Sequence, residues 1–193
     1  VGILVRAAAR VFPQLRISGI CELPWTTLLE IASVLNVSTG SIQFDYLGVN
    51  HLGWFYRLQL GGQDVIPKYA QARASETGFP SAAVIESSHA VPLVYWRLHY
   101  EREGCVNTQR QIERSRGAVL AELSEQAFRV YATGTREDIE QALDRRPSPW
   151  YEHAIGPFLA FTAGHSPRLP FFLSVPNCGL DTEFKSDDIL ECA

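Results

Sequence analysis

The chain has 193 residues, of which 46% are hydrophobic and 20% are charged. This length suits one large domain or two small ones that bury a core without covalent staples. The formal net charge of −4 argues against a general electrostatic attraction to nucleic acid or to an anionic membrane. Four scattered cysteines without a C-x-x-C pair favour a reduced protein, so we expect a cytoplasmic location.

The sequence carries neither a membrane-spanning run of about 18 apolar residues nor a signal-peptide pattern. It also contains no methionine and opens at Val1. Because translation starts with methionine, we expect that something preceded Val1: either the initiator residue alone or a whole domain.

The hydrophobic pattern predicts one α+β domain with a mixed sheet and several packed helices. Apolar residues around much of a helical turn predict a largely buried helix over residues 2–12, which Pro13 ends. A short strand is expected over residues 16–21. A capping box formed by Thr27 and Glu30 predicts the start of the second helix.

A period of two predicts strands over residues 41–46 and 54–60. Gly61-Gly62 predicts a tight hairpin to a return strand that Pro67 ends. Small and polar residues predict an irregular, mobile loop over residues 68–90. The remaining expected elements are helices over residues 92–100, 109–131, 136–143 and 150–163, and a closing strand over residues 170–175.

Cys21 and His51 form the strongest local chemical signal. Cys21 ends a predicted strand, and His51 lies in a glycine-bounded connection over residues 48–53. Thiolate and imidazole are compatible ligands of a divalent transition metal, and two protein ligands leave positions open for substrate oxygens. The alternative is an inert buried cysteine and a histidine satisfied beside a loop.

Other residues could carry chemistry without defining a site. Tyrosine acts as a general base when a nearby cation lowers its pKa, and core packing is the alternative. The tyrosines considered are Tyr46, Tyr56, Tyr95 and Tyr100. Arg114 and Arg116 could bind oxygens through their guanidinium groups or simply face solvent. The sequence shows no phosphate-cradling loop, so we expect no dinucleotide site within this chain.

Four segments together resemble the C-terminal half of family 4 glycoside hydrolases. They are residues 19–24 (G-I-C-E-L-P), 48–54 (G-V-N-H-L-G-W), 150–154 (W-Y-E-H-A) and 175–179 (V-P-N-C-G). This family includes 6-phospho-β-glucosidases, 6-phospho-α-glucosidases, α-galactosidases and α-glucuronidases. The resemblance implies that residues 1–193 form the metal- and substrate-binding domain, similar to the C-terminal domain of lactate and malate dehydrogenases. It also implies that the NAD-binding Rossmann domain is absent from this chain.

The resemblance further implies an NAD-dependent mechanism that departs from the usual pair of catalytic carboxylates. In such enzymes the sugar is oxidised at C3 with NAD, a base removes the C2 proton, the aglycone is eliminated, and water adds before the hydride returns. A divalent metal, usually manganese, polarises the oxygens at C2 and C3. By position, Cys21 and His51 match the metal ligands of the family.

Further roles follow from the same resemblance. Tyr95 is most like the catalytic tyrosine, with Tyr100 as the alternative. Arg116 and Asn50 match substrate-binding positions. Glu22 departs from the family, which has Asn there in β-specific members and Asp in α-specific ones. Glu22 is therefore either an acid catalyst with a longer reach or a residue that orients a ligand.

A second departure is residues 146–149, where the family usually has Arg-Gly-Gly. We expect an NAD- and manganese-dependent glycosidase for 6-phospho-β-glucosides or a related phosphorylated or plain glycoside. A homodimer or homotetramer is expected, and this chain should be inactive alone. The alternatives are an α-specific family member, a non-catalytic oligomerisation domain, and the substrate domain of a lactate- or malate-dehydrogenase-like enzyme.

Overall fold

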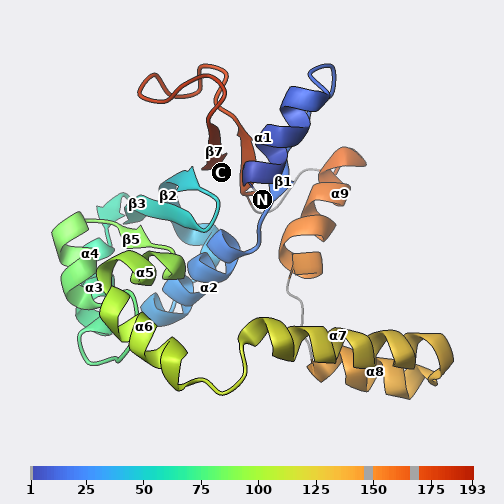
Figure 1. Ribbon diagram of the computed structural model, residues 1–193. Helices are drawn as coiled ribbons and strands as arrows, with labels where there is room; N and C mark the ends of the chain where they lie inside the picture. Colours follow the sequence, from blue (N-terminus) through green and yellow to red (C-terminus); the bar gives the residue numbers. More distant parts are fainter. Residues whose placement is uncertain (1, 146–149, 166–169) are drawn as a thin grey trace. The chain divides into compact units, whose positions relative to one another are not determined.

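The computed structural model describes residues 2–145, 150–165 and 170–193 (Figure 1). The chain divides into two compact units. The sheet unit comprises residues 1–97 together with 150–193, and the helical unit comprises residues 98–149.

The sheet unit is built on one seven-stranded sheet with the order β1-β6-β7-β2-β3-β4, and β5 pairs with β3. The strands are β1 (Gly19–Ile20), β2 (Ile42–Val49), β3 (Leu52–Leu60), β4 (Gln63–Asp64), β5 (Val91–Pro92), β6 (Leu173–Pro176) and β7 (Ile189–Cys192). Every pairing between these described strands is antiparallel. The α+β class is confirmed, although the sheet has no parallel pair among the described strands to make it mixed.

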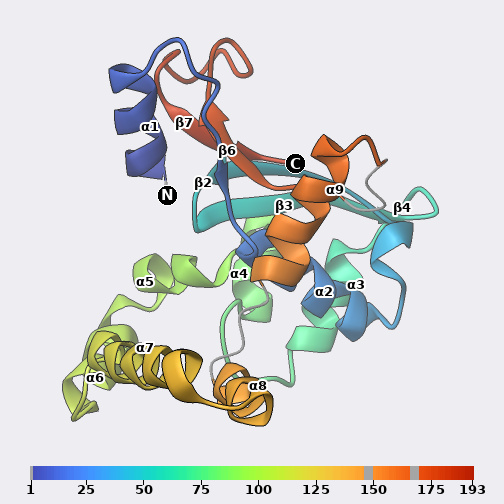
Figure 2. The same ribbon diagram turned by 90° about the vertical axis from the view of Figure 1, so that its right-hand side faces the viewer.

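The core lies between one face of the sheet and the helices α2, α3 and α4 (Figure 2). The helical segments of the sheet unit are α1 (Gly2–Val11), α2 (Leu23–Leu35), η1 (Thr39–Ser41), α3 (Ile66–Arg73), α4 (Ala82–Ser88), η2 (Val94–Trp96), the π-helical turn η3 (Tyr151–Ile155) and α9 (Gly156–Thr162). Leu28 of α2, Tyr69 of α3 and Ile85 of α4 are fully buried against Phe55 and Leu58 of β3.

The second helix begins earlier than the expected capping box. Helix α2 starts at Leu23, with Pro24 in its first turn. A proline is favourable there because the amide proton that it lacks has no helical partner at that position. The Thr27 hydroxyl donates back to the Leu23 carbonyl at 2.9 Å instead of capping a helix start. The predicted capping box is therefore wrong.

The segment expected to be an irregular loop over residues 68–90 contains α3 and α4. Pro67 starts a helix instead of only ending a strand, because it lies in the first turn of α3. Asp64 Oδ1 accepts a hydrogen bond from the Ile66 amide at 2.9 Å, and Ser81 Oγ accepts one from the Val84 amide at 3.4 Å. These side chains fix the two helix starts.

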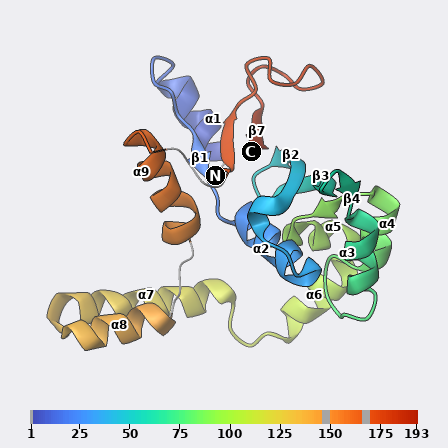
Figure 3. The same cartoon turned by 180° about the vertical axis from the view of Figure 1, so that it is seen from behind.

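The expectation of a largely buried first helix is also wrong. Among the described residues of α1, only Val5 is buried, whereas Ile3 is 86% exposed and Leu4 is 74% exposed. One face of α1 packs beside β6 and β7 (Figure 3). Arg6 and Arg10 on that helix both pair with Asp187.

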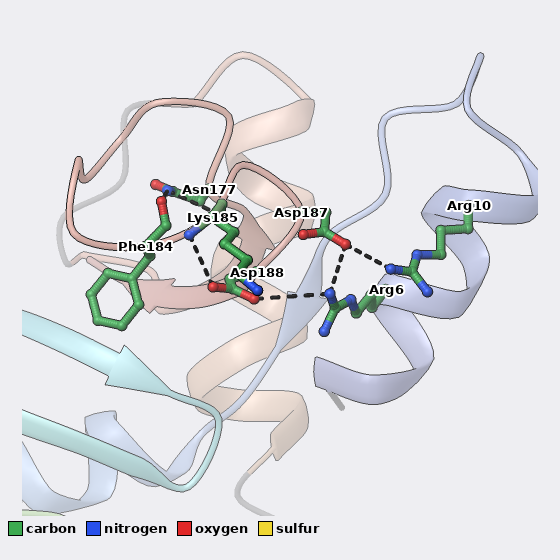
Figure 4. Close-up of polar contacts among 7 residues, drawn as sticks. All are labelled: Arg6, Arg10, Asn177, Phe184, Lys185, Asp187 and Asp188. Atoms are coloured by element: carbon green, nitrogen blue, oxygen red, sulfur yellow. Dashed lines mark hydrogen bonds and ion pairs between the residues drawn. The ribbon is translucent and has the colours of Figure 1, made fainter.

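The segment between β6 and β7 is folded around one buried amide. Asn177 Nδ2 donates to the carbonyl oxygens of Asp181 at 2.7 Å and Phe184 at 2.9 Å, and Asn177 Oδ1 accepts from the Asp181 amide at 2.8 Å. Figure 4 shows that this loop presents Asp187 and Asp188 towards Arg6. The hydrogen bonds of the Asn177 side chain thus order this loop, which has no regular secondary structure among its described residues.

The helical unit contains α6, α7 and α8, and α5 spans the boundary between the units. Their bounds are α5 (Arg97–Tyr100), α6 (Arg102–Gln111), α7 (Arg116–Thr133) and α8 (Arg136–Arg145). The helix expected over residues 109–131 is broken after Gln111, because Ser115 caps a new helix through the Ala118 amide at 3.2 Å. Helices α7 and α8 form an antiparallel hairpin (Figure 3). None of the described helices is long and apolar enough to span a bilayer.

Candidate metal centre

The register of the sheet places five residues in one row across neighbouring strands. Gly19 lies opposite Ser174, Ser174 opposite Glu191, Glu191 opposite Gly48, and Gly48 opposite Gly53. Because residues directly opposite one another share a face of the sheet, the Glu191 side chain lies in a row that otherwise holds only glycine and serine. This row leaves room for one carboxylate.

Tyr46 fills part of the space that the glycines leave. A Cβ atom on Gly53 would lie 1.9 Å from Tyr46 Oη, and one on Gly48 would lie 2.3 Å from the Gly53 Cα. With no side chain at either position, the Tyr46 hydroxyl donates to Glu191 Oε2 at 2.5 Å. Asn50 Nδ2 donates to the other oxygen, Glu191 Oε1, at 3.1 Å. Glu191 is fully buried.

Cys21 lies directly after β1 and is buried. Burial is the main cause that raises the pKa of its thiol to about 11, and the carboxylates of Glu191 and Glu22 add to the rise. Hydrogen bonds from the Leu23 backbone and the Asn50 side chain act in the opposite direction. The Asn50 side chain, which donates to Glu191, therefore also favours the ionised form of the Cys21 thiol.

His51 follows Asn50 in the turn between β2 and β3, with a φ of 70°. Its imidazole is stacked on the ring of Tyr95, with 4.8 Å between the ring centroids and 10° between the planes. Tyr95 lies in η2, and the Leu93 amide just before it donates to the Gly53 carbonyl at 3.0 Å. This bond holds η2 beside the turn that carries His51.

The other predicted site residues lie in different surroundings. Glu22 is half-buried as the N-cap of α2, and its side chain caps none of the described amides of that helix. Arg116 is the first residue of α7 and Tyr100 the last of α5, and both are exposed residues of the helical unit. Residues 146–149, which stand where the family usually has Arg-Gly-Gly, lie outside the described residues.

The residues at this edge of the sheet fit a divalent transition metal. Thiol and imidazole groups suit such ions. A buried thiolate beside two carboxylates is costly unless a cation accompanies it. The buried Ser174 hydroxyl, next to Glu191 in the row, has no hydrogen-bond partner among the described residues. Within the described part of the chain no three His, Cys, Asp or Glu side chains are arranged to hold a metal ion.

Sequence reasoning missed Glu191, whereas Tyr46 follows the core-packing alternative that the sequence left open. Strand β7 was not expected, so nothing drew attention to its carboxylate. Tyr46 was considered as a general base, but burial and then the Glu191 carboxylate raise its pKa, so it acts as a hydrogen-bond donor. A general base needs a lowered pKa. Residues 189–192 read I-L-E-C, a run too short and without regular alternation, so the sequence held no clear signal for the strand.

Taken together, the fold and this cluster define an α+β domain with a buried carboxylate, a buried thiol and a stacked imidazole beside one antiparallel sheet. The chain matches the family 4 glycosyl hydrolase C-terminal domain over residues 46–193. It therefore belongs to the family 4 glycosyl hydrolases. A sequence relative is the phospho-alpha-glucosidase PagL of Clostridium acetobutylicum, which is 35% identical over 69 residues, 34% of this chain and 16% of PagL.

Solved structures share the fold of the whole chain. The 6-phospho-beta glucosidase of Thermotoga maritima with manganese, NAD+ and glucose-6-phosphate has a TM-score of 0.74 and 18% identity, covering 99% of this chain and 46% of that one. The 6-phospho-alpha-glucosidase from gut microorganisms with NAD and glucose-6-phosphate has a TM-score of 0.76 and 20% identity, covering 99% and 47%. This chain thus spans less than half the length of these structures.

Proposed function

We propose that this chain is the metal- and substrate-binding domain of an NAD- and divalent-metal-dependent glycosidase that acts on 6-phospho-glucosides. The observation that carries the proposal lies at one turn, where Asn50 donates to the buried Glu191 and the neighbouring His51 stacks on Tyr95. The family resemblance assigns Asn50, His51 and Tyr95 to substrate, metal and proton transfer.

Cys21 and His51 would hold the metal, which is manganese in a solved relative. When bound, the ion polarises sugar oxygens and so acidifies the neighbouring C–H bond. Tyr95, which is 45% exposed, would accept the C2 proton at its Oη atom. Asn50 and Arg116 would bind sugar oxygens, and NAD would be bound by sequence outside this chain.

Glu22 bears on the choice between α- and β-glucosides. Its half-buried carboxylate lies close enough to Cys21 to raise the pKa of the thiol. It would either protonate the leaving group or orient a ligand of the metal. We take 6-phospho-β-glucosides as the first candidate substrate and 6-phospho-α-glucosides as the alternative.

Turnover by the protein expressed from its complete reading frame tests the proposal. Chromogenic 6-phospho-α- and 6-phospho-β-glucosides are offered with and without NAD+ and Mn²⁺, and release of the aglycone should need both. Tyr95→Phe should lose about 10²- to 10⁴-fold in kcat, as expected for removal of a general base. Tyr56→Phe, a half-buried tyrosine of β3, is the matched control. Turnover without NAD+, or full activity of Tyr95→Phe, would contradict the proposal.

We also propose a cytoplasmic location, which the four free cysteines support.

The oligomeric state that we propose is a homodimer or homotetramer. Large apolar side chains exposed on the helical unit, such as Phe128 and Leu143, support this assembly. Light scattering is expected to give a mass of two or four chains, and a monomer at micromolar concentration would contradict this part.

A further inference from the structure

The fully buried carboxylate of Glu191 has no place in the mechanism described so far. An ionised side chain in the interior is costly unless it is hydrogen-bonded on all sides. An apolar side chain in the small-residue row would remove that cost. A carboxylate at this position therefore calls for a role that an apolar residue could not fill.

The two oxygens of Glu191 are used separately. Oε2 accepts from the Tyr46 hydroxyl at 2.5 Å, and Oε1 accepts from Asn50 Nδ2 at 3.1 Å. Hydrogen bonds to an ionised acceptor are about twice as strong as neutral ones. Tyr46 is itself clamped between Phe55 and Phe172, with ring centroids 4.8 and 4.9 Å away. The rigid tyrosine therefore fixes the carboxylate, and the carboxylate fixes Asn50.

The backbone of Glu191 also connects the two parts of the chain that carry Cys21 and His51. It pairs with Gly48 of β2, the strand that leads into the turn carrying Asn50 and His51. On its other side it pairs with Ser174 of β6, the strand that pairs with β1 just before Cys21. Glu191 thus lies between the two segments that bring Cys21 and His51.

We infer that Glu191 is a positioning residue of the divalent-metal centre, whose buried carboxylate orients Asn50 and thereby sets the spacing of Cys21 and His51. This inference rests on the proposed function. Outer partners of metal ligands commonly alter metal affinity by about 10- to 100-fold when they are changed.

The test uses Glu191→Gln in the protein expressed from its complete reading frame. A glutamine of the same shape keeps one acceptor oxygen but presents a donor to Tyr46 or Asn50. We expect the Kd for Mn²⁺, measured from the electron paramagnetic resonance signal of the free ion, to rise by about 10- to 100-fold. With Co²⁺ in place of Mn²⁺, the thiolate-to-metal absorption should also shift, which a loss of stability alone would not cause.

Matched variants separate the possible outcomes. Glu183→Gln, in the exposed part of the β6–β7 loop, should leave the Kd and the absorption unchanged. If Glu191→Gln does not fold, Tyr46→Phe removes one hydrogen bond and should raise the Kd by about tenfold. If Glu191→Gln folds and keeps the wild-type Kd and spectrum, the inference is overturned. If Glu191→Gln does not fold, a wild-type Kd and spectrum in Tyr46→Phe overturn it.

A different result would refute the proposed metal site at Cys21. If Cys21→Ser keeps both the wild-type Kd and the cobalt absorption, the metal does not bind at Cys21. If Cys21→Ser loses them while Glu191→Gln keeps them, the metal centre stands and only the role of Glu191 is refuted.

Discussion

Gly53 shows how a single missing side chain shapes the candidate centre. A Cβ atom at this position would lie 1.9 Å from Tyr46 Oη and 2.3 Å from Tyr46 Cζ. Both atoms lie at the tip of the Tyr46 side chain, whose ring packs against Phe55 and Phe172 and so has little freedom to withdraw. Even a methyl group at residue 53 must therefore displace Tyr46 from Glu191.

Gly53→Ala is expected to lower the free energy of unfolding by about 1–3 kcal/mol, the usual cost of overpacking a tight interior. Urea denaturation followed by tryptophan fluorescence measures this change. Gly40→Ala is the matched control, because its Cβ atom would meet only Ser38 Oγ at 3.8 Å. Equal stability of the two variants would show that Tyr46 is not held as described.

The sequence identified the polar residues that lie in recognisable motifs. Cys21, Asn50 and His51 follow strand ends and glycine-bounded turns, which local patterns reveal. Glu191 could not be predicted, because its importance arises only from the register that places it opposite Gly48 and Ser174. Partners 141 residues apart in sequence leave no local signal. The predicted roles of all the site residues, Cys21, Glu22, Asn50, His51, Tyr95 and Arg116, stay predictions.

At the scale of elements, the contact between α1 and the β6–β7 loop depends on Asp187. Hydrogen bonds from Arg6 and then Arg10 lower the pKa of Asp187 to about 2. An unfolded aspartate has a pKa of about 3.9. Because the folded pKa is the lower one, the contact stabilises the protein above pH 4, and this contribution is lost as the pH falls towards 2.

We therefore expect Asp187→Asn to have a lower Tm than the wild type at pH 6, and the difference to shrink between pH 4 and pH 2. Differential scanning calorimetry across this range measures it. Glu183→Gln, a charge change elsewhere in the same loop, should show no such difference. A constant gap in Tm down to pH 2 would show that the ion pairs do not form as described.

Asn177 organises the same loop through its amide. Asn177→Asp replaces two N–H donors with a carboxylate oxygen that faces the carbonyl oxygens of Asp181 and Phe184. Loss of these buried bonds should cost about 1–3 kcal/mol of unfolding free energy, and repulsion adds to it. Urea denaturation at pH 7 measures this cost, with Asn107→Asp on α6 as an exposed control. An unchanged midpoint would contradict the assigned role of the amide.

Elements with strong local signals were predicted better than those defined by tertiary contacts. The Gly61-Gly62 hairpin formed as expected, with φ values of 60° and 81°, because glycine favours that backbone region. Helices α3 and α4 were missed because small and polar residues were interpreted as a loop and Pro67 only as the end of a strand. Their stability comes from burial of Tyr69, Ala70 and Ile85 in the core, which composition alone does not reveal.

At the scale of the whole molecule, family membership and fold agree, while the reaction is a proposal carried by a few residues of the sheet unit. The chain covers 46% of the Thermotoga maritima structure, so the proposed reaction needs more sequence than this chain supplies. In the proposed reaction, the C2 proton of the sugar is removed and later replaced. Ordinary glycoside hydrolysis by two carboxylates leaves that proton in place.

The most direct test is turnover of a 6-phospho-glucoside in D₂O by the protein from its complete reading frame, with NAD+ and Mn²⁺. Nuclear magnetic resonance of the sugar product measures the isotope at C2. We predict deuterium at C2, because the proton taken by Tyr95 exchanges with solvent before it is replaced. Product that keeps protium at C2 while the glycoside is hydrolysed would contradict the proposed elimination chemistry.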